Sequence, residues 1–314
     1  MADTQHWSRQ KEQGTRWMRS VTLASIRLLP GVLVRILAIP VGFFFWLFSG
    51  RQRKAIGAYL RKVRPGCRLY TLPLFLAFSI TVIEKVESWA GRIKFGKIHF
   101  QDDDITEIWK ELEQGKGAFL ICSHLGNMEM LRAIADYGDI GVSHPVPVIS
   151  IVDFKVTEGF NQMMEKANSN SMQNIISAYD IGPDTILRLK EHVASGGIAV
   201  IAGDRTSASK SGRNFGISFL GAQAQFPQGP FVMASLLDVP VYYVFAARRK
   251  PLSVSAEYNM HIHRAAVEFA GSRAERKSQI QHMAEDYVGY LEKYCNKYPY
   301  QWYNFYEYWE KGDL

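Results

Sequence analysis

The sequence predicts an α/β fold in which a mixed, mostly parallel central sheet is flanked by helices. From about residue 92 onward, short β-branched runs alternate with amphipathic stretches of helical spacing. The runs AFLIC at 118–122 and IAVIA at 198–202 are apolar throughout, which is typical of central strands covered on both faces. With 314 residues, of which 47% are hydrophobic, the chain can bury a large core, and a disordered or collagen-like protein is excluded.

The elements follow in order from this alternation. We expect strands at 93–100, 118–122, 146–152, 173–177, 198–202, 240–246 and 252–262. We expect helices at about 104–114, 127–137, 156–168, 183–194 and 228–237, and a closing helix at about 272–297 whose apolar residues recur every three or four positions. The aromatic end of the chain, YPYQWYNFYEYW, is expected to fold back over the core with its polar tips in water, in preference to making a second membrane contact.

The first 70 residues differ from the rest, because acidic residues are almost absent after Glu12 while arginines and lysines punctuate an apolar background. The apolar run at 36–48 would extend ~20 Å as a helix, against a hydrocarbon core of ~30 Å. A helix lying in the membrane interface is therefore favoured, with a true span and a buried core helix as alternatives. This division predicts a membrane-associating segment at 1–70 and an α/β domain at 71–314.

Two details of that first segment can be checked in a structure. Four arginines fall within about half of the helix circumference, as expected of a helix that lies in the interface: Arg16, Arg19, Arg27 and Arg35. Pro30 and Pro40 are expected to bend or divide the segment. A cleaved signal peptide is not favoured, because the apolar run begins far from Met1.

The net charge limits the kinds of partner that are expected, and the cysteine content limits the kinds of site. The net charge of +7 indicates an anionic partner. Its position beside the apolar run favours anionic lipid over nucleic acid, for which no recognisable module is present. The three cysteines are too few and too far apart for a disulfide framework or a zinc knuckle. His261 and His263 share a strand face, yet no further ligand lies nearby in the sequence, so no metal site is expected.

The residues that carry chemistry follow the strand at 118–122, where the sequence continues as Ser123 and then HLGNME at 124–129. On one continuous helix His124 and Glu129 would lie about 140° apart and could not meet. They can meet if His124 lies in a strand-to-helix loop, Gly126 permits a tight turn, Asn127 caps the helix and Glu129 lies in its first turn. Glu129 would then hydrogen-bond one imidazole nitrogen and leave the other as a base.

A histidine and carboxylate pair without a serine nucleophile suits direct transfer, in which the base deprotonates an acceptor hydroxyl as it attacks an activated carbonyl. Cys122 and Ser123 adjoin His124, but neighbours along an extended strand point to opposite faces, and no GxSxG motif occurs. Neither residue is therefore expected to be a nucleophile.

Other candidate substrate-binding residues surround this motif. Asp204, at the carboxyl end of a strand, is suited to a ligand crevice. Arg205 and Arg213 could clamp a phosphate or phosphopantetheine group, or Asp204 and Arg205 could only pin the loop. Arg132, one turn beyond Glu129, either faces the site or pairs with that carboxylate. Gly229 in FPQGP is expected to start a helix near the substrate.

The motif HLGNME resembles the H-x-G-N-W/M-E motif of the bacterial lipid A biosynthesis acyltransferase branch of the lysophospholipid acyltransferase-like superfamily. IAVIAGDRTS at 198–207 and the block at 215–245 resemble later parts of the same family in order, and both ends of the chain match as well. The resemblance covers nearly the whole chain. Met128 in place of Trp, and Gly203-Asp204-Arg205 where Asp-Gln is commoner, look more like the relatives associated with fatty-acid and aryl-polyene synthesis.

The resemblance implies a glycerolipid acyltransferase-like fold, with His124 as the base, Glu129 as its orienting partner, and Asp204 and Arg205 in the acceptor or donor site. It implies transfer of a fatty acyl chain from an acyl thioester, without a cofactor. Because acyl carrier proteins are strongly acidic, the positive charge of this chain favours acyl carrier protein over acyl-coenzyme A as the donor. The acceptor would be a hydroxyl of a lipid or glycolipid at the cytoplasmic face of a bacterial inner membrane. A membrane-associated thioesterase or hydrolase with the same dyad and a catalytically silent membrane scaffold are the alternatives.

Overall fold

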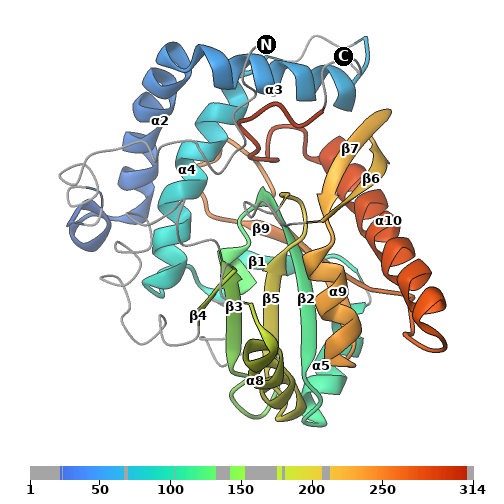
Figure 1. The fold of residues 1–314 in the computed structure, drawn as a ribbon. Coiled ribbons are helices and arrows are strands. Elements are labelled where there is room, and N and C mark those ends of the chain that lie inside the picture. The colour runs from blue at the N-terminus through green and yellow to red at the C-terminus, as the bar shows by residue number, and fades with distance from the viewer. Residues whose placement is uncertain are drawn as a thin grey trace.

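The central element of the fold is a seven-stranded sheet with the strand order β1-β9-β8-β2-β5-β3-β4 (Figure 1). The computed structural model describes residues 22, 24–66, 70–102, 104–131, 142–152, 175–178, 181–206 and 213–309. Strands β8, β2, β5, β3 and β4 are parallel, whereas β9 runs antiparallel to β8 and carries β1 parallel to itself at the edge. The strands are β1 Ile98–Phe100, β2 Ala118–Gly126, β3 Val148–Val152, β4 Ile175–Ser177, β5 Ile198–Ala202, β8 Val241–Arg248 and β9 Tyr258–Arg264. The predicted α/β class and mostly parallel sheet are confirmed.

Helices cover both faces of this sheet because alternate strand residues point to opposite sides. Phe119 and Ile121 of β2 belong to the core under helices α8 Pro183–Ala194, α9 Gly229–Leu237 and α10 Arg273–Lys297. Leu120 and Cys122 belong to a second core under α5 Asp104–Glu113. Strand β2 is thus buried on both faces, as its apolar sequence predicts.

Most of the predicted elements are found, and β5 and α8 have the predicted bounds. In the range 93–100 only the last three residues form a strand, after a 3₁₀ turn at Phe95–Lys97, and β9 begins later than expected. The predicted helix at 156–168 and most of that at 127–137 lie outside the described residues. A hairpin of β6 Asn214–Phe219 and β7 Ala222–Pro227 was not predicted. Its turn places Leu220 and Gly221 both at positive φ, where the usual Asn-Gly signal is missing.

After a short helical stretch at 24–28, the N-terminal part of the described chain contains α2 Gly31–Phe48, α3 Gly50–Val63 and α4 Leu72–Trp89. Pro30 separates the helical residues 24–28 from α2, so the segment is divided there as predicted, whereas Pro40 lies inside α2 and does not divide it. Helix α2 lies along α4 (Figure 1). Helix α3 buries Tyr59 and Leu60 in the same core as the sheet, so the predicted boundary at residue 70 does not separate two cores.

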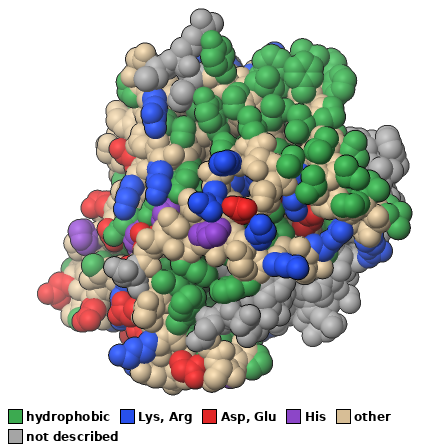
Figure 2. Space-filling view, turned by 180° about the vertical axis from the view of Figure 1, so that it is seen from behind, with side chains coloured by type: hydrophobic (Ala, Val, Ile, Leu, Met, Phe, Trp, Pro, Cys, Tyr) green, Lys and Arg blue, Asp and Glu red, His purple; other side chains and the backbone are tan. Residues whose placement is uncertain are grey.

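The outer surface of α2 is apolar. Leu37 is 55% exposed and Phe44 57% exposed, and several neighbouring apolar side chains are similarly open to solvent. By length and composition, α2 is the one helix among the described residues that could cross a membrane. Figure 2 shows apolar side chains gathered at one side of the molecule, with basic side chains along the border of that region.

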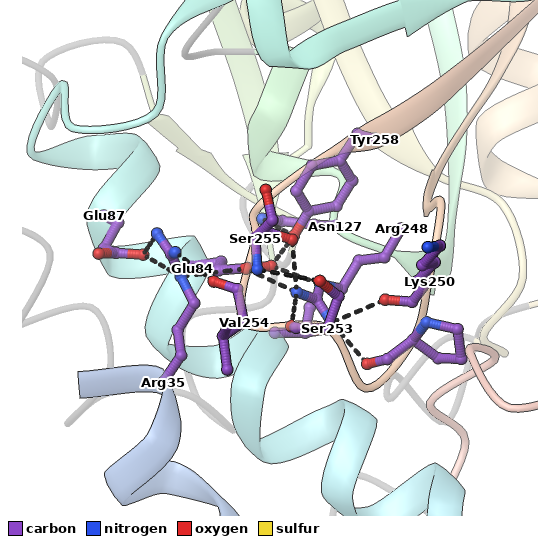
Figure 3. Close-up of polar contacts among 12 residues, drawn as sticks. Arg35, Glu84, Glu87, Asn127, Arg248, Lys250, Ser253, Val254, Ser255 and Tyr258 are labelled. Carbon is purple, nitrogen blue, oxygen red and sulfur yellow. Dashed lines mark hydrogen bonds and ion pairs between the residues drawn. The ribbon is translucent and has the colours of Figure 1, made fainter. Parts of the chain in front are cut away.

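Arg35 corrects one expectation about this segment. It was predicted to share about half of the helix circumference with the other arginines in a helix that lies in the membrane interface, but it is buried between α2 and α4. Its guanidinium donates to Glu87 at 2.6 Å, lies 3.2 Å from Glu84, and donates to the Val254 carbonyl at 2.7 Å (Figure 3). The carboxylates of α4 provide the pairing that a buried guanidinium requires, and these partners could not be assigned from the pattern of α2 alone.

Arg248, at the end of β8, completes this buried ion network, which consists of Arg35, Glu84, Glu87 and Arg248. Its guanidinium is fully buried and donates to both oxygens of Glu84, at 2.8 and 3.0 Å. The same group donates to backbone carbonyls of the following turn, including Ser253 at 2.6 Å (Figure 3). The network therefore fastens α2 and α4 to the end of β8 and the turn that follows.

The aromatic end of the chain packs back into the core, as predicted, but its polar tips are not in water, since the Trp302 indole and the Tyr308 hydroxyl donate to Asp204. Trp302, Tyr303, Tyr308 and Trp309 are all buried. Trp302 forms a β-bridge with Leu125, next to His124. The tail thereby covers the carboxyl ends of the central strands.

Candidate active site

His124 lies at the end of β2, in a bulge of that strand. Pairing with β8 runs from Cys122 opposite Val244 to Gly126 opposite Ala246, so β2 uses more residues than β8 over this stretch. Bulges of this kind re-aim side chains near active sites. Gly126 closes the bulge at φ 72°, and a Cβ there would meet the Ala246 carbonyl oxygen at 1.9 Å. Gly126 thus has the conformational role that was expected of a glycine, but at a strand bulge in place of a tight turn, and His124 belongs to the strand and not to a loop after it.

Asp204, two residues beyond the end of β5, holds the imidazole. Its Oδ1 lies 2.8 Å from Nδ1 of His124, and its Oδ2 accepts the backbone N–H of the same residue at 2.9 Å. Trp302 of the tail donates its indole N–H to Oδ2 at 2.9 Å. Strands β2 and β5 are parallel neighbours, so the residues after their carboxyl ends meet at one edge of the sheet.

The protonation state follows from burial and the neighbouring charges. Burial and the charge of Arg205 lower the pKa of His124 to about 4, although Asp204 acts in the opposite direction. Burial would raise the pKa of Asp204, but the charges and hydrogen bonds of His124 and Arg205 bring it below its ordinary value. At neutral pH His124 is neutral and Asp204 ionised. The ring then donates Nδ1–H to the carboxylate, and Nε2 carries a lone pair that can accept a proton.

The expected pair of His124 and Glu129 is thus replaced at Nδ1 by a pair of His124 and Asp204. The physical reason is the adjacency of β2 and β5, which spacing along one segment cannot reveal. Glu129 remains beside the site, since its charge acts on Cys122 and on Lys85. Its backbone N–H donates to Asn127 Oδ1 at 3.2 Å, so the predicted cap by Asn127 is confirmed.

Asn127 itself is fully buried, and its side chain makes hydrogen bonds only within the described part of the protein. Its amide nitrogen donates to the Tyr258 hydroxyl at 3.3 Å, and that hydroxyl donates to Glu84 of the ion network (Figure 3). The segment that carries Glu129 is connected in this way to α4.

Arg205 points to the C-terminal tail. Its Nε donates to Asn304 Oδ1 at 3.0 Å, and a terminal nitrogen donates to the Tyr303 carbonyl at 3.0 Å. The backbone N–H of Tyr303 in turn donates to the His124 carbonyl at 3.0 Å. The tail therefore holds both the histidine strand and the arginine, so Arg205 does pin this part of the chain, as one of the two interpretations held.

Lys85 is a site residue that sequence reasoning missed. It is half-buried on α4, on the helix face that carries Thr81, which hydrogen-bonds Tyr303 at 2.9 Å, and Ser88, which contacts Met130 at 3.1 Å. Burial lowers the pKa of Lys85, Glu129 raises it, and Arg205 lowers it further. The signal available in the sequence was a lysine between the two glutamates of a largely apolar helix.

The remaining predicted residues are less closely tied to the histidine. Arg213 is exposed just before β6, and its carbonyl accepts the Gln228 N–H at 2.9 Å. Gly229 begins α9, as predicted. Arg132 lies outside the described residues. Cys122 and Ser123 are buried, and burial raises the pKa of the Cys122 thiol well above its ordinary value, as befits a residue that is not a nucleophile.

His261 and His263, which share a face of β9, make hydrogen bonds within the protein. Asp102 accepts from His261 at 2.8 Å, and the other nitrogen of that ring lies 3.0 Å from the Tyr298 hydroxyl. His263 lies 2.6 Å from the Tyr294 hydroxyl and stacks on Tyr290. Across the part of the chain that is described, no group of three or more histidine, cysteine or acidic side chains is arranged to hold a metal ion.

The arrangement can perform general-base chemistry. It presents a neutral imidazole with a fixed orientation, 22% exposed side-chain surface and two neighbouring cations, Lys85 and Arg205. Such a base can accept a proton from a hydroxyl or a water molecule that attacks an electrophile. No protein-family model matches the chain, and no curated protein matches it.

Proposed function

We propose that this protein is an acyltransferase that moves a fatty acyl chain from a thioester carrier to a hydroxyl of a lipid or glycolipid acceptor. The observation that carries the proposal is the neutral His124, held at Nδ1 by an ionised Asp204 at the carboxyl end of the central strand. The resemblance of HLGNME and the following blocks to the lipid A acyltransferase branch supports the same chemistry.

The step is a direct transfer. Nε2 of His124 accepts the hydroxyl proton as the acceptor oxygen forms a bond to the thioester carbon, and the carbonyl electron pair moves onto the carbonyl oxygen. When that pair returns, the carbon–sulfur bond breaks and the thiolate takes the proton from the imidazolium. The ionised Asp204 stabilises this imidazolium and keeps the ring in the productive tautomer.

The exposed apolar surface of α2 supports a membrane-bound site for this reaction. This α2 surface consists of Val32, Leu33, Ile36, Leu37, Val41, Phe43, Phe44, Leu47 and Phe48. Helix α3 follows it directly and carries basic residues in GRQRKAIGAYLRKV, without an acidic one. Apolar area beside positive charge is the combination that binds anionic lipid, and we propose the cytoplasmic face of a bacterial inner membrane as the location.

The chemistry is tested by His124→Ala in cells and in vitro. Mass spectrometry of lipids should reveal an acylated species that depends on the wild-type protein and disappears with the variant. With myristoyl-coenzyme A and acyl carrier protein thioesters as donors, the variant should lose about 10²–10⁴-fold of the thioester consumption. Thioester consumption without any acylated lipid would favour a thioesterase, and unchanged lipids with a folded His124→Ala protein would favour a scaffold.

The identity of the acyl donor is tested by the salt dependence of kcat/KM. Acyl carrier proteins are acidic, so association with this basic protein should weaken as salt screens charges beyond ~8 Å. We expect kcat/KM for the carrier-protein donor to fall more steeply with salt than that for acyl-coenzyme A, and charge reversal at the exposed Arg213 to affect the carrier-protein donor more. Equal salt slopes would reject the carrier-protein donor and leave acyl transfer standing.

Membrane binding is tested by a substitution that introduces one negative charge on the α2 surface. Leu37→Asp should reduce recovery with vesicles that contain phosphatidylglycerol, because a carboxylate would have to enter the apolar layer. Leu187→Asp is the matched control, since Leu187 is 58% exposed on α8, away from α2. Equal loss in both variants would contradict the assignment of the lipid contact to α2.

A further inference from the structure

Asn304 carries a hydrogen-bond donor with no acceptor. The side chain is 2% exposed, and its Oδ1 accepts from Arg205 Nε at 3.0 Å. A guanidinium only donates, so the atom that faces it must be the amide oxygen and the other must be the amide nitrogen. Within the described part of the chain, that nitrogen has no hydrogen-bond partner. An unpaired buried amide is costly, which makes a missing acceptor at this position significant.

A second donor lies close by. The Tyr306 hydroxyl is also buried without a hydrogen-bond partner among the described residues. It lies within electrostatic reach of the residues that adjoin His124: burial raises the pKa of Tyr306, and the charges of Arg205 and Asp204 both act on that pKa. Two residues of one tail segment therefore lack acceptors beside the carboxylate that holds His124.

The charges around these donors favour a neutral oxygen over a permanent anion. Lys85 and Arg205 lie within electrostatic reach of the carboxylates of Glu129 and Asp204. Two positive and two negative groups surround a neutral imidazole, so a resident phosphate would bring an unbalanced charge into a buried position. A carbonyl oxygen that becomes negative only during the reaction would be neutral when bound and would gain from the two cations afterwards.

We propose that the Asn304 amide nitrogen and the Tyr306 hydroxyl donate hydrogen bonds to the carbonyl oxygen of the acyl thioester and stabilise its negative charge during transfer, with Lys85 and Arg205 adding positive potential. This inference rests on the proposed acyl transfer and names the group of the donor that the tail binds. It also gives the buried aromatic tail a catalytic purpose beyond packing.

The first test is Asn304→Asp, which keeps the acceptor for Arg205 and replaces the unpaired donor by an oxygen. With myristoyl-coenzyme A and the full chain in detergent micelles, kcat should fall about 10²-fold while KM stays near the wild-type value, because the bond strengthens only in the transition state. The rates are measured from pH 5 to pH 9. If kcat of the variant is low at every pH, the loss reflects the missing donor. If kcat of the variant reaches the wild-type maximum at another pH, the proposal is overturned.

Hydroxyl deletions provide the matched comparison. Tyr306→Phe should lower kcat without lowering the unfolding temperature, because its hydroxyl has no partner in the free protein. Tyr59→Phe removes another buried hydroxyl that lacks a partner, and it should leave kcat unchanged. Equal kcat in the wild type, Tyr306→Phe and Asn304→Asp would overturn the proposal and indicate that the two donors bind only water.

Binding of two unreactive donors separates this inference from the function on which it rests. One probe is S-tetradecyl coenzyme A, a thioether without the carbonyl, and the other is S-(2-oxopentadecyl) coenzyme A, a ketone that retains a carbonyl. By calorimetry, the ketone should bind the wild type more tightly, and Asn304→Asp should abolish the difference. Thioester consumption with the difference intact in the variant overturns only the role of Asn304. No consumption and no binding of either probe by the wild type overturns both proposals.

Discussion

The molecule contains two polar clusters at neighbouring places that differ in how completely their groups are paired. In the ion network, the guanidinium of Arg248 is fully buried and faces Glu84 and several backbone carbonyls (Figure 3). In the site, His124 has one nitrogen bonded to Asp204 and a partly exposed ring, and Asn304 nearby has an unpaired donor.

The comparison teaches how to tell a structural cluster from a functional one. A buried charge whose hydrogen bonds are all made within the protein is available for holding elements together and for little else. A cluster that fixes the orientation of a side chain but leaves hydrogen-bond donors unused gives up stability in return for a defined geometry. This combination is typical of reactive sites. Substitutions should therefore change activity in one cluster and stability in the other.

The largest effect is expected from Asp204→Asn. The variant keeps the shape of the side chain but removes the charge that stabilises the imidazolium and allows the wrong tautomer, so activity should fall about 10²–10⁴-fold. The unfolding temperature should change little, because Trp302 and the His124 N–H can still donate to the amide oxygen. The check is thioester consumption beside a thermal melt. A Glu129→Gln variant that loses more activity than Asp204→Asn would return the orienting role to Glu129.

The next effect concerns stability. Arg248→Met removes the main partner of Glu84 and leaves a buried carboxylate with less compensation, so the free energy of unfolding should fall by about 3–5 kcal/mol. Burial already raises the pKa of Glu84, and Arg248 opposes that shift. Urea unfolding measures the change. Arg249→Met is the control, because the exposed pair of Arg249 and Glu257 is expected to contribute less than about 1 kcal/mol.

The pH dependence of activity distinguishes the buried His124 from a histidine with an ordinary pKa. Because the pKa of His124 is about 4, the acid limit of activity should lie near pH 4 and not near the ordinary value of about 6.5. Arg205→Gln removes a charge that lowers this pKa, so the limit should move to higher pH. An unchanged or lower limit in that variant would contradict the assignment of the limit to His124.

The same shift has a consequence for stability. The unfolded chain protonates its histidine at about pH 6.5, whereas folded His124 resists protonation until about pH 4. The unfolded state therefore binds more protons between these values, and His124 favours unfolding progressively as the pH falls from 6.5 to 4. Compared with the wild type, His124→Asn should lose less stability over that window in urea titrations.

The smallest effect is expected where the two clusters meet. Tyr258→Phe removes a hydroxyl that donates to Glu84 and accepts from Asn127. Stability should fall by about 1–2 kcal/mol, and activity should fall by less than about tenfold, because Asn127 still caps the segment of Glu129. Kinetics and urea unfolding of the same preparation give both values. A loss as large as that of Asp204→Asn would mean that the network controls the site directly.

Local pattern accounts for most of the fold. The continuous apolar runs at 118–122 and 198–202 identified the two central strands, and β5 and α8 have the predicted bounds. These predictions succeed because burial on one or two faces imposes a period on the residues of each element. The hairpin of β6 and β7 was missed because its turn uses Leu220 at positive φ, where sequence rules expect Asn or Gly.

By itself, the sequence determined the class of fold, the apolar character of α2, and the segment in which the candidate base His124, the positive-φ glycine Gly126 and the cap Asn127 follow one another. Each of these depends on neighbours within a few positions, so spacing reveals it. Only the tertiary structure decided that Asp204 orients His124, that Arg35 is an internal ion-pair residue, and that Asn304 meets Arg205. These contacts join residues between 52 and 99 positions apart, and they depend on strand order and on the return of the tail. No periodicity along the chain encodes such contacts, because the packing of whole elements brings them together.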